Sequence, residues 1–222
     1  MDLAGLQRLK REGKKIVAVV AWDAPMAAIA ERAGVDLISV GDSVGVNLWG
    51  QKEGEITLDE MLVVCKAVRR GAKKTLVSCD LPEKEMPGHA LRLVAEGGAD
   101  LVKLLAPPSV IEKIVKKGVR VFAEFHGDKG SAEELVKHAQ QLEEAGASLL
   151  DFRHSGPAAG AAVAKAVKIP VIGGLGGGPW LDGRVRRLDV LIGKAVEQVA
   201  GATLHAYADD VRSGRPLRSD RA

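Results

Sequence analysis

The sequence has few aromatic residues, few cysteines and no long apolar run. Phe, Trp and Tyr make up 3% of the 222 residues, although 46% are hydrophobic, so a core must be built mainly from Val, Leu, Ile and Ala. The two cysteines, Cys65 and Cys79, indicate neither a disulfide framework nor a metal site. No stretch approaches the length of a membrane span, and the first residues lack the apolar core of a targeting signal. We therefore expect a soluble, cytoplasmic protein with no membrane partner.

A large charge of one sign is also missing. The formal net charge is +3, from 32 Lys and Arg against 29 Asp and Glu. This excess is too small to predict a nucleic-acid partner, which normally needs a strongly basic surface. The composition leaves a small-molecule ligand as the expectation.

Short apolar runs rich in β-branched residues alternate with helical patterns along the whole chain. Eight such alternations with short connections predict a (β/α)8 barrel of the TIM type, in the α/β class, as a single domain over residues 1–222. An open doubly wound sheet is the alternative, and it requires the weakest, eighth strand to be something else. The expected strands are residues 15–22, 36–41, 75–79, 101–105, 119–125, 147–152, 170–173 and 187–192.

Local signals mark where the helices begin and end. Thr57 with Glu60, and Ser131 with Glu134, have the spacing of capping boxes. A similar phrase recurs at residues 32–36, 96–100 and 144–148, each time between the end of a helix and the start of a strand, which is consistent with a repeated unit. Residues 1–14 form a helical pattern expected to cover the barrel bottom, and residues 44–56 form a long loop.

Carboxylates follow two of the predicted strands. The run 37–40 leads into Gly41, Asp42 and Ser43, and the run 75–79 leads into Asp80. The carboxyl ends of the strands of a parallel barrel meet at one mouth, where ligands bind. Two carboxylates there predict a hard cation such as Mg²⁺, although each aspartate alone could simply cap a helix or close a loop.

Charged residues also interrupt two apolar strands. Lys103 lies between Val102 and Leu104, and Glu124 lies in the strand that ends near His126. Strand interiors exclude charge unless it is paired or functional. Lys103 is therefore expected to pair either with a substrate carboxylate or with one of the aspartates as a structural ion pair.

Several motifs occur in the order in which they occur in ketopantoate hydroxymethyltransferases. The chain resembles that family most strongly through about residue 104, and less continuously after it. The motifs are Ala21-Trp22-Asp23-Ala24-Pro25, Val40-Gly41-Asp42-Ser43-Val44-Gly45, Thr57-Leu58-Asp59-Glu60-Met61, Asp80-Leu81-Pro82, Val102-Lys103-Leu104, Ile169-Pro170-Val171-Ile172-Gly173 and Asp182-Gly183-Arg184-Val185.

The resemblance implies a fold, a reaction and a set of roles. The family has a (β/α)8 barrel of the phosphoenolpyruvate mutase/isocitrate lyase superfamily and forms large homo-oligomers. It transfers a hydroxymethyl group from methylenetetrahydrofolate to 2-oxoisovalerate, giving ketopantoate for pantothenate biosynthesis. Carried over to this chain, Asp42 and Asp80 would hold Mg²⁺, and Ser43 and Lys103 would bind the 2-oxo acid. The metal would polarise the keto group and stabilise an enolate.

Three positions depart from the family pattern. Leu105 replaces an acidic residue that supports the metal. The family's histidine on strand five falls at Glu124 without a gap or at His126 with a shift. Its catalytic glutamate on strand six falls at Arg153 or His154, depending on the alignment, and Arg cannot act as a base whereas neutral His can.

These departures leave three functions open. The first is hydroxymethyl transfer to 2-oxoisovalerate. The second is a lyase, aldolase or mutase reaction on another 2-oxo acid, in which Arg153 binds an anionic group and Glu124 or His154 acts as acid or base. The third is a non-catalytic paralogue that serves as a binding or assembly subunit. Dependence on methylenetetrahydrofolate separates the first from the second, and failure to bind Mg²⁺ favours the third.

Overall fold

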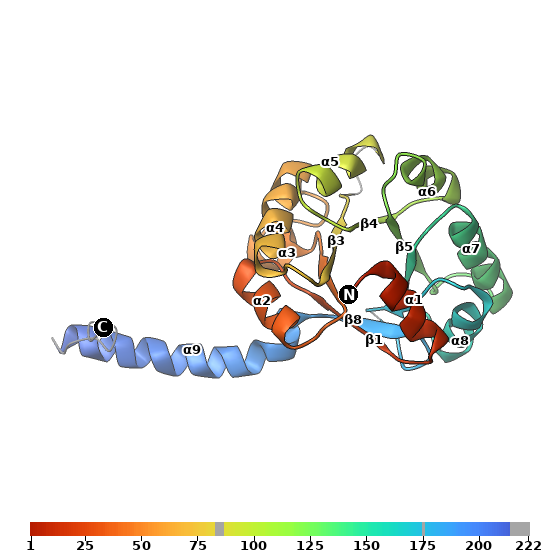
Figure 1. Ribbon diagram of the computed structural model, residues 1–222. Helices are drawn as coiled ribbons and strands as arrows, with labels where there is room; N and C mark the ends of the chain where they lie inside the picture. Colours follow the sequence, from red (N-terminus) through yellow and green to blue (C-terminus); the bar gives the residue numbers. More distant parts are fainter. Residues whose placement is uncertain (83–86, 175, 214–222) are drawn as a thin grey trace. The chain divides into compact units, whose positions relative to one another are not determined.

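The computed structural model describes residues 1–82, 87–174 and 176–213. Helices separate successive strands from β1 to β7, and the described residues between β7 and β8 form no helix (Figure 1). The strands are β1 Ile16–Val20, β2 Leu37–Val40, β3 Leu76–Asp80, β4 Leu101–Leu105, β5 Val121–His126, β6 Leu149–Arg153, β7 Val171–Gly173 and β8 Gly183–Arg187. The α-helices are α1 Leu3–Arg11, α2 Ala24–Arg32, α3 Val44–Leu48, α4 Leu58–Gly71, α5 Ala90–Ala95, α6 Pro108–Val115, α7 Ala132–Glu144, α8 Pro157–Ala166 and α9 Leu188–Arg212, with a short 3₁₀ helix η1, Pro87–His89.

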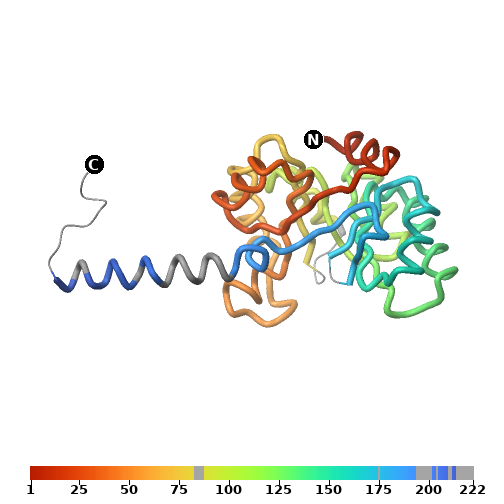
Figure 2. The backbone as a smooth tube through the Cα atoms, turned by 90° about the horizontal axis from the view of Figure 1, so that it is seen from below, coloured from red at the N-terminus to blue at the C-terminus, as the bar shows by residue number. Residues whose placement is uncertain are grey.

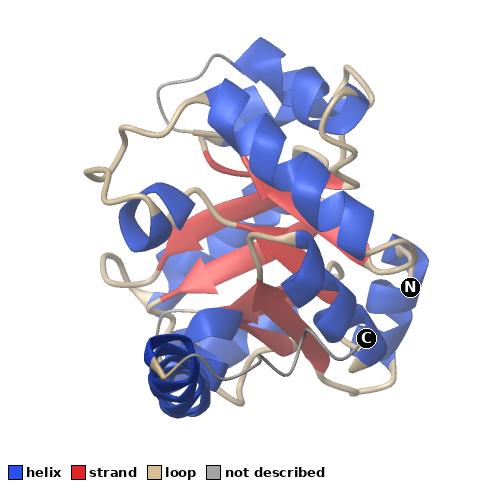
Figure 3. Cartoon of the chain, turned by 90° about the vertical axis from the view of Figure 1, so that its left-hand side faces the viewer, coloured by secondary structure: helices blue, strands red, loops and turns tan. Residues whose placement is uncertain are grey.

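The eight strands close into one parallel barrel in the order β1 to β8. Successive strands from β1 to β8 pair in parallel, so all carboxyl ends of the strands lie at the same mouth. Figure 3 shows the strands, in red, surrounded by helices, in blue. The predicted (β/α)8 barrel is therefore confirmed, and the open doubly wound sheet is excluded.

Contacts within the chain divide it into two compact units, Met1–Arg186 and Arg187–Ala222. The barrel belongs to the first unit, apart from the last residue of β8, and α9 belongs to the second. The predicted domain boundary of 1–222 stays a prediction. None of the helices that the structure describes combines the length and apolar character needed to cross a lipid bilayer.

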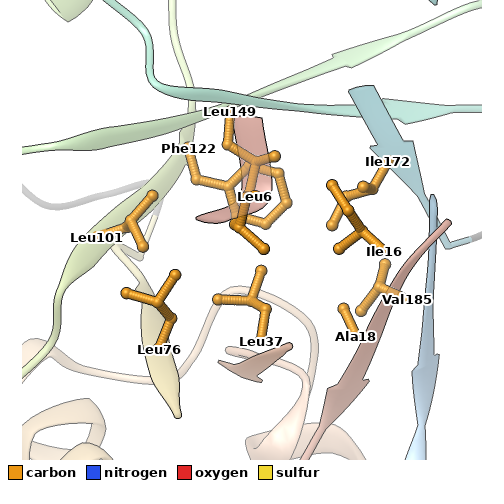
Figure 4. Packing of buried hydrophobic residues seen from close by; sticks show 10 residues of the cluster. All are labelled: Leu6, Ile16, Ala18, Leu37, Leu76, Leu101, Phe122, Leu149, Ile172 and Val185. Atoms are coloured by element: carbon orange, nitrogen blue, oxygen red, sulfur yellow. The ribbon is translucent and has the colours of Figure 1, made fainter. Parts of the chain in front are cut away.

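The floor of the barrel is an apolar cluster to which every strand contributes. Leu6 of α1 is fully buried among these side chains, so the first helix closes the bottom as expected (Figure 4). Figure 2 shows α1, in red, at one end of the barrel and the orange segment near residue 50 at the other. The cluster consists of Leu6, Ile16, Ala18, Leu37, Leu76, Leu101, Phe122, Leu149, Ile172 and Val185.

A second contact ties α1 to the last part of the barrel. The ammonium of Lys10 donates to the carbonyl oxygens of Ala164 and Ile169, at 2.8 and 2.9 Å. It also forms an ion pair with Asp182 at 2.8 Å. Since Ile16 N–H donates to the carbonyl of Asp182 at 2.9 Å, the beginning of the chain closes the ring against residues 164–182.

The repeated junctions have the same backbone geometry. Gly34, Gly98 and Gly146 follow three different helices, and all three have φ between 77° and 94°. This left-handed conformation suits glycine, because a side chain would clash with the backbone. The repeat seen in the sequence is therefore a repeated helix stop.

An aspartate at the start of a strand often completes the junction. In each case its carboxylate accepts a hydrogen bond from the backbone N–H of a residue in the preceding strand, at 2.8–2.9 Å, and so fixes the register between the two strands. The pairs are Asp36 with Val17, Asp100 with Val77, and Asp182 with Val171.

The helix starts at Thr57 and Ser131 are capping boxes, as predicted. Two other expectations are corrected. The eighth strand is Gly183–Arg187 rather than residues 187–192, because Leu188 begins α9 and the Val-Leu-Ile run belongs to a continuous helical segment. The loop over residues 44–56 contains a short helix, α3, which begins directly after Ser43.

Candidate active site

A polar layer lies directly above the apolar floor. Side chains in a strand alternate between its two faces, so the residue two positions after each floor residue also points into the barrel. On β2 to β6 these residues are polar, and all of them are buried: Ser39, Ser78, Lys103, Glu124 and Asp151. The hydroxyl of Ser78 donates to that of Ser39 at 3.0 Å. The next inward positions, which include Asp80, His126 and Arg153, face the mouth.

Lys103 is the centre of this layer. Its Nζ lies 2.6 Å from Glu124 Oε2, 3.2 Å from Asp151 Oδ2 and 3.5 Å from Asp80 Oδ2. Burial by itself would lower the pKa of Lys103, but the carboxylates of Asp80, Asp151 and Glu124 raise the pKa above its ordinary value. Lys103 is therefore a permanent cation, and its three protons match three carboxylates.

Arg153 adds a second cation to the same cluster. Its Nη2 lies 2.9 Å from Glu124 Oε2, and its Nε lies 3.3 Å from Asp151 Oδ2. Burial tends to raise the pKa of Glu124, yet the charges of Lys103 and Arg153 lower it below its usual range. Glu124 is therefore ionised, and its other oxygen, Oε1, lies 2.9 Å from Nε2 of His126.

Asp80, at the end of β3, is less completely paired. Its Oδ1 is buried and has no hydrogen-bond partner among the residues that the structure describes. Burial raises the pKa of Asp80 to about 7, and the nearby charge of Asp42 raises it as well, while Lys103 lowers it. Two neighbouring carboxylates and an unpaired buried oxygen are unfavourable unless a cation balances them.

This donor set fits a hard divalent cation. Asp80 offers a buried oxygen without a partner, and within residues 1–82, 87–174 and 176–213 the Asp42 carboxylate also has no hydrogen-bond or ion-pair partner. No group of three or more His, Cys, Asp or Glu side chains with metal-ligand geometry occurs there. Two carboxylates suffice for Mg²⁺, which commonly keeps water and substrate oxygens as its other ligands.

The end of β2 is held in place by Trp22, which follows β1. Its indole N–H donates to the carbonyl of Gly41 at 2.9 Å, and both groups are buried. Ser43 comes two residues later at the start of α3, and its side chain makes no capping hydrogen bond there. The Ser43 hydroxyl is thus placed beside Asp42 without a role in the helix.

The remaining predicted positions fall into different places. Leu105 is about half exposed at the end of β4, so no acidic group stands beside Asp80 on that strand. His154 is exposed, has a φ of 51° and lies directly after β6. Asp23, which also follows a strand, caps α2 by accepting from Met26 N–H at 2.7 Å.

Asp151 is the member of the cluster that sequence reasoning missed. It is 1% exposed, pairs with Lys103 and Arg153, and leaves Oδ1 without a partner among the described residues. Its signal was the same as that of Lys103 and Glu124, a charge inside an apolar strand. The strand register places it beside Glu124, and His126 beside Arg153.

Comparison with known sequences agrees with these motifs. The sequence model of the family described as ketopantoate hydroxymethyltransferase matches residues 1–215. The chain is 36% identical over 221 residues to the 3-methyl-2-oxobutanoate hydroxymethyltransferase of Shouchella clausii (strain KSM-K16), covering 87% of this chain and 79% of that protein. It is 34% identical over 219 residues to the enzyme of the same name from Nitrosococcus oceani, covering 87% and 83%.

Solved structures show the same fold at lower sequence identity. A 2,3-dimethylmalate lyase, described as a PEP mutase/isocitrate lyase superfamily member, has a TM-score of 0.70 at 17% identity and covers 99% of this chain and 91% of its own. The phosphoenolpyruvate phosphomutase of Streptomyces platensis subsp. rosaceus has a TM-score of 0.72 at 15% identity, covering 97% and 89%.

The motifs, the barrel and the sequence comparisons point to one group of enzymes. The family model covers nearly the whole chain, and the named relatives are matched over more than three quarters of their length. The chain therefore belongs to the ketopantoate hydroxymethyltransferase family, whose members are transferases that form a C–C bond by adding a hydroxymethyl group to a 2-oxo acid.

Proposed function

We propose that this protein binds Mg²⁺ and transfers a hydroxymethyl group from methylenetetrahydrofolate to 2-oxoisovalerate, giving ketopantoate. The observation that carries the proposal is the buried Oδ1 of Asp80, which lies near Asp42 at the barrel mouth and has no hydrogen-bond partner within residues 1–82, 87–174 and 176–213. A site that keeps such an oxygen is arranged for a ligand with positive charge.

The residues of β2 and β3 bind the metal and the substrate. Asp42 and Asp80 supply carboxylate oxygens to the cation, and the Ser43 hydroxyl donates a hydrogen bond to the carboxylate of the 2-oxo acid. When bound, the metal polarises the keto oxygen and so favours loss of a proton from the adjacent carbon.

The residues of β4 to β6 set the electrostatics of the site. Lys103 lies below the mouth, with its ammonium bound to three carboxylates. It helps to neutralise Asp80 and holds Glu124 in place, and its charge also favours an anionic substrate. Arg153 supports Glu124 from the other side, at 2.9 Å. In the transfer, the enolate carbon forms a C–C bond to the one-carbon unit, and the two C–N bonds between that unit and the folate break. One water molecule supplies the hydroxyl group and one proton, and this proton and the one lost from the substrate carbon go to the two folate nitrogens. The products are ketopantoate and tetrahydrofolate.

Binding and turnover test the proposal separately. Calorimetric titration with Mg²⁺ measures the metal site, and ¹H NMR of 2-oxoisovalerate with methylenetetrahydrofolate measures ketopantoate formation. We expect Asp80→Ala and Asp42→Asn to lose both. The matched control Asp59→Asn removes a carboxylate that is exposed on α4, and it should change neither measurement.

Two results would contradict the proposal. If Asp80→Ala binds Mg²⁺ with the affinity of the wild-type protein, Asp80 on β3 is not a ligand of the metal. If the wild-type protein binds Mg²⁺ and 2-oxoisovalerate but forms no ketopantoate with the folate, the proposed metal site is retained and the proposed hydroxymethyl transfer is excluded.

A further inference from the structure

The proposed reaction needs a base at the barrel mouth, and most charged groups there are unsuited to that task. Lys103 and Arg153 are cations held by carboxylates. Glu124 is ionised, but its pKa lies below the usual range and both cations contact its Oε2. A carboxylate so stabilised is a weak proton acceptor. Asp151 is almost fully buried beneath the mouth.

His126 differs from these groups in both exposure and contacts. It is the last residue of β5, its side chain is 37% exposed, and its Nε2 lies 2.9 Å from Glu124 Oε1. Since an ionised carboxylate can only accept, Nε2 of a neutral His126 donates its proton to Glu124. No partner for Nδ1 is found in the part of the chain that the structure describes, so this nitrogen keeps a free lone pair.

Glu124 is itself fixed from two directions. Lys103 on β4 and Arg153 on β6 both contact its Oε2, at 2.6 and 2.9 Å, and leave Oε1 to His126. The carboxylate is thereby oriented and remains charged. This is the arrangement in which a carboxylate sets the tautomer of a histidine and stabilises the imidazolium that forms when the histidine takes a proton.

His154 is the other histidine at the mouth. Its ring centroid lies 6.1 Å from that of His126. It is exposed, and no carboxylate contacts it among the described residues. Its ring is therefore not oriented by a charged partner, which makes it the weaker candidate for proton removal.

We propose that His126, oriented by Glu124, is the base that removes the proton from C3 of the 2-oxo acid. This inference rests on the proposed function. The C3–H bond breaks, the proton goes to Nδ1 of His126, and the electron pair of that bond forms the C2–C3 double bond of the enolate while the keto oxygen takes the negative charge. Glu124 is a positioning residue that balances the imidazolium, and Arg153 holds Glu124.

Proton exchange in D₂O tests this step without the folate. Wild-type protein with Mg²⁺ should exchange the C3 proton of 2-oxoisovalerate for deuterium, which ¹H NMR follows as loss of the C3–H signal. His126→Asn and His126→Gln should each slow exchange by about 100-fold or more, the size of effect usual for a general base. His205→Asn, an exposed histidine on α9, is the matched control and should exchange at the wild-type rate.

Two further measurements separate catalysis from folding and binding. Binding of 2-oxoisovalerate in the presence of Mg²⁺, measured by saturation-transfer NMR, should persist in both His126 variants, and so should the thermal unfolding midpoint. In Glu124→Gln the acid limb of the exchange profile should move to lower pH, because a neutral amide stabilises an imidazolium less than a carboxylate does. The charged and titratable groups that face His126, and that therefore bear on this pH profile, are Glu124, Arg153 and His154.

The outcomes distinguish this inference from the proposed function. If the His126 variants exchange the C3 proton at the wild-type rate, or if exchange is lost in His154→Asn alone, His126 is not the base. Neither result contradicts the proposed hydroxymethyl transfer. An unmoved pH profile in Glu124→Gln contradicts the positioning role of Glu124. If the wild-type protein catalyses neither exchange nor transfer, both proposals fall.

Discussion

The two sides of the barrel mouth differ in how their charges are matched. On β2 and β3, the Asp42 carboxylate and Oδ1 of Asp80 have no protein partner among the described residues. On β4 to β6, Lys103 and Arg153 are held by the carboxylates of Glu124 and Asp151. Of the four oxygens of these two carboxylates, Oδ1 of Asp151 alone has no partner in the part of the chain that the structure describes. Both sides are acidic and at least partly buried, so burial alone does not explain the difference.

The difference separates two kinds of polar site. A matched cluster is satisfied without a ligand and keeps its geometry, since removal of any member exposes its partners to an unfavourable environment. An unmatched carboxylate costs free energy until a cation arrives, and that cost is what makes the site selective for one. The matched side therefore shapes the mouth, while the unmatched side is available for binding.

Lys103→Met breaks the matched side and should have the largest effect. It leaves the carboxylates of Asp80, Glu124 and Asp151 around an apolar side chain, with only Arg153 as a counter-charge. We expect the free energy of unfolding at pH 7 to fall by about 3–5 kcal/mol, as measured by urea denaturation. Lys113→Met, on the exposed face of α6, should stay within about 0.5 kcal/mol of wild type. A loss below about 1 kcal/mol in Lys103→Met would show that the cluster is not energetically coupled.

Asp80→Asn tests the unmatched side through its pH dependence in metal-free buffer. The pKa of Asp80 is raised to about 7 in the folded protein from 3.8, so its contribution to stability is fully present below about pH 4 and is lost as pH rises through about 7. At pH 8 the variant should therefore be more stable than wild type by about 2–4 kcal/mol. The gain should shrink towards pH 5, and an equal gain at both pH values would exclude titration of Asp80 as its cause.

Leu105→Glu should extend the unmatched side. Leu105 shares the inward parity of Lys103 on β4 and is half exposed beside Glu124. A carboxylate there adds a third oxygen donor near Asp80, and we expect Mg²⁺ affinity to rise about tenfold, or ~1.4 kcal/mol. Calorimetric titration measures this change, and Leu105→Gln is the control for side-chain size. Equal affinities in the two variants would place residue 105 away from the cation.

Glu31→Gln gives the smallest effect and provides a reference for a matched carboxylate far from the mouth. Backbone hydrogen bonds from Lys74 and Thr75 lower the pKa of Glu31 to about 2. Its stabilisation is present above about pH 4.5 and is lost as pH falls towards 2, the opposite sign from Asp80. Because solvent screens this group, we expect a loss below about 1 kcal/mol at pH 7, measured by urea denaturation. That loss should decrease at pH 3; a constant difference would point to packing instead of charge.

Local patterns were sufficient to predict most of the fold. The alternation of apolar runs, the capping boxes at Thr57 and Ser131, and the repeated junction glycines are all determined within a few residues of sequence. The strand-end position of Asp80 and the charge of Lys103 inside β4 could be found in the same way. These features depend on the period of a strand and on helix-capping chemistry, which a single sequence carries.

What could not be predicted depends on contacts between distant elements. Lys103 has three carboxylate neighbours only because the barrel register brings β3, β5 and β6 around β4, and Asp151 joins them for the same reason. The eighth strand was placed too late because the Val-Leu-Ile run after Leu188 is as apolar as a strand. The partnership of His126 with Glu124 also followed only from geometry.

The ion pair between Lys10 and Asp182 has a consequence for synthesis of the chain. Lys10 is made early, yet its partners lie at residues 164, 169 and 182. While the ribosome is still adding those residues, Lys10 lacks these three partners and β1 has one unpaired edge. Closure of the ring must therefore wait until most of the chain has been translated, and this long sequence separation favours slow folding. A circular permutant that opens the chain between α1 and β1 and joins the original termini would bring Lys10 closer in sequence to residues 164–182. The separation between β1 and the same residues would not change. A change in the refolding rate would therefore report that the contacts of Lys10 limit closure.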